Sequence, residues 1–191
     1  MIKLRYGNTN TFLLRGSGGL LIDTDYAGTL AAFYREIKRN GAEVSDIDYV
    51  MATHYHPDHM GLIAELVKRG VKLLLVEDQR DYVHFSDKIF ARDRVRFEPI
   101  DEAQATVISC AESREYLAGI GIAGEIIRTP SHSPDSVSLL LDDGDCFVGD
   151  LEPYSYLEAY GENRVLQEDW DNILCRSPKR VFFAHQKEML F

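Results

Sequence analysis

The segment IDYVMATHYHPDHMGLIAELV, residues 47–67, places three of the chain's six histidines within six positions. The apolar run from Ile47 to Ala52 predicts a strand, and from His59 onward apolar side chains recur at helical spacing as far as Arg69-Gly70. A strand that leads through a loop of imidazole and carboxylate groups into a helix is typical of a metal site, because these groups bind zinc, iron and related divalent ions at neutral pH.

The spacing within this loop predicts two half-sites. His54 and His56 are separated by one residue, so in an extended segment their side chains project from the same side. Pro57 ends the extended segment and turns the chain, which directs Asp58 and His59 elsewhere. Each pair needs further ligands from other parts of the chain.

Those further ligands are expected at the ends of other predicted strands. His132 follows the run 122–129, Asp150 follows the hairpin of runs 137–141 and 146–149, and His185 follows the run 181–184. Strands are also expected at 11–14, 20–22, 71–76 and 106–110, with helices after Thr29, at 112–118 and at 164–175. If these strands form layered sheets with helices outside, His54, His132, Asp150 and His185 converge on one edge.

The composition limits the class of protein. A chain of 191 residues with 45% apolar content is expected to form one domain, residues 1–191, with a substantial core. The net charge of −10 argues against binding to nucleic acid or to an anionic membrane. Three separated cysteines without a C-x-x-C pair, and no apolar run of 18 residues, indicate a soluble protein of the reducing cytoplasm.

The ordered motifs THYHPDHMG (53–61), TPSHS (129–133), FVGD (147–150) and FFAH (182–185) resemble those of the metallo-β-lactamase superfamily. The resemblance extends from Leu21 to His185 and implies an α/β fold, a four-layer αββα sandwich with a metal site at one edge of its two sheets. It also implies that His54, His56 and His132 hold a first divalent ion.

The same resemblance implies a second ion held by Asp58, His59 and His185, with Asp150 bridging the two ions. Asp23, in LIDTD, is either a turn residue or the acceptor that orients a metal-bound histidine, and its match to an early aspartate of the family favours the second role. The ions are expected to be zinc, with iron or manganese as alternatives.

The implied activity is metal-assisted hydrolysis. Two ions that share a bridging hydroxide lower the pKa of water to about 7, and the hydroxide attacks a small-molecule thioester, ester or lactone. Asp58 is the candidate for orienting the nucleophile. β-Lactamase activity is not expected as the main role, because those enzymes use a cysteine near the position of Asp150.

Three alternatives stay open from the sequence. A phosphodiesterase would need cations near the site, for which Lys88, Arg92, Arg94 and Arg96 are candidates. Family members that hold iron have redox activity, and an inactive scaffold is disfavoured by the complete ligand set. The substrate and the oligomeric state are not determined by the sequence.

Several other residues near the motifs are weaker candidates. Tyr154, Tyr156 and Tyr160 follow Asp150 and either line the substrate pocket or take part in ordinary packing. His84 is expected to be a surface or packing residue. It lies in the charged segment 77–105, whose pattern predicts no clear element but which is expected to form a lid or substrate wall.

Overall fold

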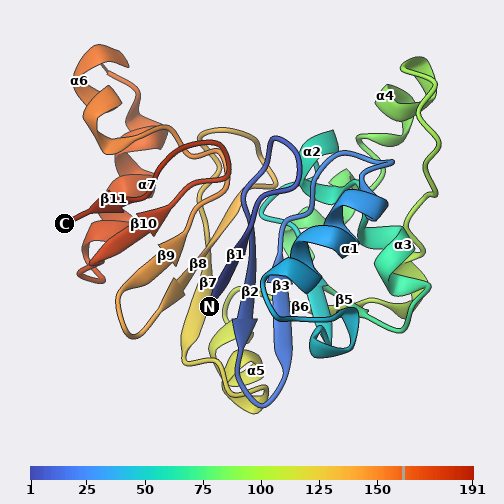
Figure 1. Cartoon of the computed structure of the whole chain (residues 1–191). Helices are drawn as coiled ribbons and strands as arrows, with labels where there is room; N and C mark the ends of the chain where they lie inside the picture. Colours follow the sequence, from blue (N-terminus) through green and yellow to red (C-terminus); the bar gives the residue numbers. More distant parts are fainter. Residues whose placement is uncertain (161) are drawn as a thin grey trace.

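The computed structural model describes residues 1–160 and 162–191, in which two β-sheets pack face to face with helices on their outer sides (Figure 1). The strands of the first sheet, in spatial order, are β1 (Ile2–Leu4), β2 (Thr11–Arg15), β3 (Gly19–Ile22), β4 (Tyr49–Met51), β5 (Lys72–Val76) and β6 (Thr106–Ile108). The strands of the second sheet, in sequence order, are β7 (Gly124–Arg128), β8 (Val137–Leu141), β9 (Asp145–Phe147), β10 (Arg180–Phe182) and β11 (Met189–Leu190).

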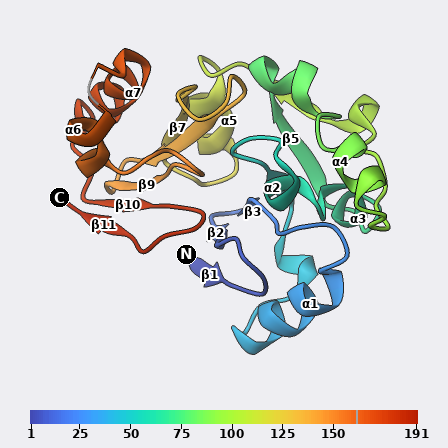
Figure 2. The ribbon, with the colours of Figure 1, turned by 90° about the horizontal axis from the view of Figure 1, so that it is seen from above.

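The helices are α1 (Leu30–Arg39), α2 (Pro57–Met60), α3 (Ile63–Val67), α4 (Asp87–Arg92), α5 (Ser113–Gly119), α6 (Leu157–Tyr160) and α7 (Arg164–Leu174). Helix α5 lies at the lower end of the sheets in Figure 1, and its Leu117 packs in the cluster between them. Seen from above, α1, α3 and α4 lie beyond the first sheet, and α6 and α7 lie beyond the second (Figure 2). This order of layers is the predicted αββα sandwich.

Side-chain alternation along the strands explains the four layers. In β3, Leu20 and Ile22 belong to the apolar cluster between the sheets, whereas Leu21 belongs to the cluster beneath α1 and α3. In β8, Leu139 joins the cluster between the sheets and Leu140 packs toward α7. Because successive side chains of a strand point to opposite faces, strands that are apolar on both faces need a layer on each side.

The strand directions bring several strand ends to one edge. Strands β3, β4, β5 and β6 are parallel, as are β9 and β10, so the loops that follow them leave from matching ends. The loops after β3, β4, β7, β9 and β10 contain Asp23, His54, His132, Asp150 and His185, respectively. The predicted convergence of these residues is therefore observed.

One predicted element was wrong in extent. The segment from His59 to Arg69 forms two short helices, α2 and α3, instead of one continuous helix. Gly61 lies at the break, where an added Cβ would stand 2.2 Å from the backbone nitrogen of Ala27 and 2.5 Å from the carbonyl oxygen of Asp25. The chain is therefore held against the loop after β3, and that contact interrupts the helix.

Two edge strands, β1 and β11, were given no residue range from the sequence. β1 has three residues and β11 has two, so neither has the alternation that sequence analysis requires. Both are edge strands defined by pairing, β1 with β2 and β11 with β10. None of the helices built from the described residues has the length and apolar character of a membrane span.

The inter-sheet cluster should dominate stability. Leu139 is fully buried there, so Leu139→Ala should lower the free energy of unfolding by about 2–5 kcal/mol, through lost apolar burial and the remaining cavity. Urea denaturation followed by far-UV circular dichroism measures the change. Val165→Ala, at a residue 46% exposed on α7, is the matched control and should change stability by less than about 0.5 kcal/mol. Equal losses in both variants would contradict this assignment of the core.

Candidate metal centre

The first group of ligand atoms joins the loop after β4 to the loop after β7. His54 Nε2 lies 3.0 Å from His56 Nδ1, and His132 Nε2 lies 3.1 Å from the same His56 nitrogen. His54 is fully buried, whereas His132 is at the surface. Three imidazole nitrogens at these distances from one another can coordinate one ion.

The second group joins the start of α2 to the loop after β10. His185 Nε2 lies 3.2 Å from Asp58 Oδ2, and His59 Nε2 lies 3.8 Å from Asp58 Oδ1. Pro57 occupies the first turn of α2 and fixes the backbone there. The ligand atoms thus form one group of His54, His56 and His132 and another of Asp58, His59 and His185, while a further grouping joins His54, His59 and Asp150.

Asp150 lies between the two groups. Its Oδ2 is 3.9 Å from His54 Nε2, 3.7 Å from His132 Nε2 and 3.4 Å from His59 Nε2. Its Oδ1 is 3.2 Å from His185 Nε2. Asp150 Oδ2 thus faces imidazoles of both groups, and Oδ1 faces His185 of the second group.

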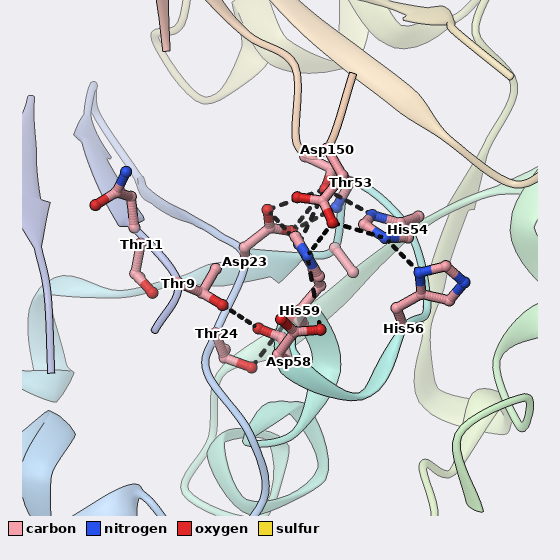
Figure 3. A network of polar contacts seen from close by, with 12 residues as sticks. Thr9, Thr11, Asp23, Thr24, Thr53, His54, His56, Asp58, His59 and Asp150 are labelled. Carbon is pink, nitrogen blue, oxygen red and sulfur yellow. Dashed lines mark hydrogen bonds and ion pairs between the residues drawn. The ribbon is translucent and has the colours of Figure 1, made fainter. Parts of the chain in front are cut away.

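Asp23 supports His59 from behind (Figure 3). His59 Nδ1 donates to Asp23 Oδ2 at 3.0 Å, and the backbone nitrogen of Thr53 donates to Asp23 Oδ1 at 2.6 Å. With Nδ1 held by Asp23, His59 directs Nε2 toward Asp58 and Asp150. Asp23 also has a positive φ of 58°, a strained backbone conformation of the kind that clusters at functional sites.

Two of the histidines resist protonation. Burial lowers the pKa of His54 well below its usual value, and the charge of His59 lowers it further. The pKa of His56 is also lowered, first by burial and then by His132. Neutral imidazoles are the form that binds metal ions.

Two further histidines, His59 and His185, each lie close to two carboxylates. The pKa of His59 is raised to about 10, because the carboxylates of Asp23 and Asp150 outweigh the opposing effect of burial. The pKa of His185 is also raised to about 10, by contacts with Asp150 and Asp58.

Both carboxylates that face the centre stay ionised. Burial on its own would raise the pKa of Asp150, but its contacts with His185 and His59 hold the pKa well below the usual value. The pKa of Asp58 is lowered in the same way, because the contact with His185 outweighs burial. Two fixed negative charges at one point favour a cation.

The ligand atoms fit divalent cations. His59 Nε2 is buried and has no hydrogen-bond partner among the described residues, and the buried Asp150 Oδ1 has only the ion-pair contact with His185. Buried polar atoms without partners are costly, and a cation between them removes that cost. His/Asp sets with these spacings are therefore positioned to bind metal.

Three polar residues that support the ligand loops were not recognised in the sequence. Gln79 is fully buried, and its Nε2 donates to the carbonyl oxygens of Ala52, Thr53 and Asp135. Asp135 in turn accepts from the backbone nitrogen of Tyr55 at 2.7 Å. Its position in the sequence could have indicated this role, because Gln79 closely follows the end of β5 at the same edge of the sheet.

A third support comes from the segment 77–105. Ser86 is fully buried, and its hydroxyl donates to the carbonyl oxygen of Tyr55 at 2.6 Å. Phe85, which is 52% exposed, lies with its ring centroid 5.4 Å from that of His56. The segment whose pattern predicted no clear element thus borders the metal centre.

His84, Tyr154 and Tyr156 belong neither to the ligand groups nor to the lining of the cavity beside them. His84 is exposed and contacts Asp87 and Glu102, as expected for a surface residue. Tyr154 packs edge-on against Trp170 with ring centroids 5.5 Å apart, and Tyr156 is 44% exposed. The side chain of Tyr160 lies outside the described residues.

A small cavity of about 190 Å³ adjoins the centre. Its lining consists of His132, Gly149, Asp150, Glu152, Phe183, His185 and Gln186. Three of the proposed ligands therefore form one wall of a space that can admit a small molecule.

Comparison with known proteins places this geometry in a family. A sequence model described as the metallo-beta-lactamase superfamily matches residues 4–185. The probable metallo-hydrolase MJ0888 of Methanocaldococcus jannaschii is 29% identical over 177 residues, which cover 90% of this chain and 76% of that protein.

Two further matches widen the comparison. The putative diflavin flavoprotein A 2 of Synechocystis sp. is 32% identical over 144 residues, covering 74% of this chain but only 22% of the flavoprotein. The solved structure of TTHA1623 in a di-iron-bound form is 21% identical, with a TM-score of 0.70, and covers 99% of this chain and 93% of that one, a likeness of fold. Since the family match includes every proposed ligand, this chain belongs to the metallo-beta-lactamase superfamily.

Proposed function

We propose that the protein is a hydrolase with two divalent metal ions, zinc in its native form, that cleaves a small-molecule thioester, ester or lactone. The observation that supports the proposal most directly is the position of Asp150 between two three-residue ligand groups. Relatives named as a probable metallo-hydrolase and as metal-dependent hydrolases agree with this class of reaction.

The chemistry divides between the ions and the protein. Two bound divalent ions supply hydroxide at neutral pH and polarise the oxygen of the bond that is attacked. His54, His56 and His132 hold one ion, and Asp58, His59 and His185 hold the other. Asp150, which lies between the two groups, would contact both ions.

Asp58 has a second role in this proposal. Its lowered pKa keeps the carboxylate ionised, so it accepts a hydrogen bond and orients the attacking water. Thr9 Oγ1 donates to the carbonyl oxygen of Asp58 at 2.7 Å, which fixes the backbone from which the carboxylate extends.

Phosphodiester hydrolysis is the less favoured use of the same ions. A phosphodiester substrate is anionic and needs nearby cations. Within the described part of the chain, none of Lys88, Arg92, Arg94 and Arg96 lines the cavity beside the centre. Arg92 is bound to Asp93 instead.

A redox function with iron is the second candidate. The similarity to a putative diflavin flavoprotein over 74% of this chain favours it, since that relative belongs to a different reaction class. The ligand set of five imidazoles and two carboxylates suits iron as well as zinc. Metal identity therefore separates the two proposals.

The decisive experiment combines metal analysis with a substrate panel. Protein purified from its own host should contain zinc, and zinc-loaded protein should hydrolyse thioesters, esters or lactones faster than phosphodiesters or β-lactams. A chelator should abolish this hydrolysis, and added zinc should restore it. Iron in the native protein together with no hydrolysis of any substrate would reject the proposal.

Removal of Asp58 tests the second metal position. Asp58→Ala should reduce the metal content by about one equivalent per chain and abolish turnover, because the second ion would then have only His59, His185 and the shared Asp150 as ligands. Plasma mass spectrometry measures the metal. His84→Ala is the control, since His84 is an exposed histidine outside the ligand groups, and it should leave metal content and rate unchanged. Full activity of Asp58→Ala would contradict the assignment of a second metal position to Asp58, His59 and His185.

Asp23 is expected to position His59 without binding metal itself. Asp23→Asn should weaken metal affinity about 10–100-fold, because an amide cannot accept from both Thr53 and His59 as the carboxylate does. Competition with a coloured chelator measures the affinity. Asp145→Asn, a change at a buried aspartate that accepts from the guanidinium group of Arg180, should leave metal affinity unchanged. Equal affinities for both variants would contradict the role of Asp23.

A further inference from the structure

Phe85 is an exposed aromatic residue beside the metal centre. Its side chain is 52% exposed, and its ring lies against that of His56 with centroids 5.4 Å apart and planes inclined by 39°. An apolar ring that is both exposed and adjacent to a ligand offers a surface to a substrate held at the ions.

The backbone around Phe85 is fixed. The neighbouring Val83 and Ser86 are fully buried, and the backbone nitrogen of Phe85 donates to the carbonyl oxygen of Tyr82 at 2.8 Å. The bond from Ser86 to Tyr55 ties the segment to the loop that contains His54 and His56. The exposure of Phe85 is therefore imposed by its ordered neighbours, and the ring is presented at little cost in conformational entropy.

A second side of the centre is polar. The cavity there is lined by residues that do not include Phe85. Glu152 and Gln186 line the cavity of about 190 Å³ next to His132 and His185. At about 30 Å³ for each water molecule, this space holds a small polar group, not a long chain.

Glu152 gives this cavity a negative charge. The residue is partly buried, and its backbone oxygen accepts from Nε1 of the fully buried Trp170 at 2.9 Å. No described residue donates a hydrogen bond or ion pair to its carboxylate, and the cavity lining contains no Lys or Arg. A carboxylate in this setting selects a hydrogen-bond donor and repels an anion.

We propose that the substrate lies across the metal pair, with an apolar group against Phe85 and a hydroxyl or ammonium group in the cavity beside Glu152. This inference rests on the proposed hydrolase function and narrows its substrate class to small esters, thioesters or lactones that have one apolar end and one end that donates hydrogen bonds. Phe85 and Glu152 then determine specificity without coordinating metal.

Two series of substrates test the apolar end. In one series the acyl chain grows from acetyl to hexanoyl, and in the other the alcohol or thiol grows likewise. In one of the series, kcat/KM should rise about two- to threefold per added methylene, because part of each group is buried on the ring. In Phe85→Ala the rise of kcat/KM with chain length should nearly disappear, because KM for the longer substrates increases. Phe85→Leu should restore part of the rise.

Val165→Ala removes an exposed apolar side chain elsewhere and should leave the rise unchanged. Metal content should equal that of the wild type in every variant, which excludes an indirect effect through His56. If kcat/KM is independent of chain length in both series, or is unaffected by Phe85→Ala, the aromatic wall is rejected.

A charge series tests the polar end. For substrates that differ only in a terminal group, the kcat/KM of the wild type should be highest with ammonium, lower with hydroxyl and lowest with carboxylate. Glu152→Gln should reduce the ammonium-to-carboxylate ratio of kcat/KM about tenfold, the effect of losing one charge-assisted hydrogen bond. Glu168→Gln, at an exposed glutamate on α7 outside the cavity lining, has the same change in net charge and should leave the ratio unchanged. Equal ratios in wild type and Glu152→Gln would reject the role of Glu152.

The outcomes separate this inference from the function on which it rests. Hydrolysis by the wild type without dependence on chain length or charge leaves the hydrolase function standing and rejects the inference. Failure of the zinc-loaded wild type to cleave any member of the three series rejects both. Calorimetric binding of the corresponding product acids and alcohols gives a second measurement, in which Phe85→Ala should weaken the binding of hexanoyl products more than that of acetyl products.

Discussion

The hydrogen bond from His59 Nδ1 to Asp23 Oδ2 connects the fold to the chemistry of the site. Asp23 leaves the end of β3 with a positive φ, and it also accepts from the backbone of Thr53 beyond the end of β4. The interaction thus joins two neighbouring strand ends and fixes which nitrogen of His59 faces the centre. A buried carboxylate is tolerated here because three donor atoms surround it.

The metal centre also depends on the packing of the two sheets. The first sheet supplies His54, His56, Asp58 and His59, whereas the second supplies His132, Asp150 and His185. The rings of Phe12, Phe147 and Phe182 pack between the sheets with centroids 5.0 to 5.5 Å apart. Because such an interior is close-packed, a change in this packing alters the distances between ligands on opposite sheets. Stability and metal affinity are therefore coupled through the inter-sheet core.

The sequence predicted the parts of the structure that have a local pattern. The apolar runs predicted the longer strands. The fold was predicted from the H-x-H-x-D-H motif and from the order in which His132, Asp150 and His185 follow it. The break at Gly61 was missed because it results from contact with Ala27, more than thirty positions away. Gln79 was missed for the same physical reason, since its three acceptors belong to other loops. Bonds between distant loops leave no periodicity in the sequence.

The residues that fix the reaction and those proposed to fix the substrate obey different constraints. The proposed ligands contact one another at the centre, so replacement of one changes the surroundings of the others. Phe85 and Glu152 lie outside this network, and the chain around them is held by its backbone or by neighbouring residues such as Ser86 and Trp170. Their side chains can therefore change while the ligand geometry persists. Substrate choice in this chain is a property of the segments beside the motif, which is why the family assignment alone does not determine it.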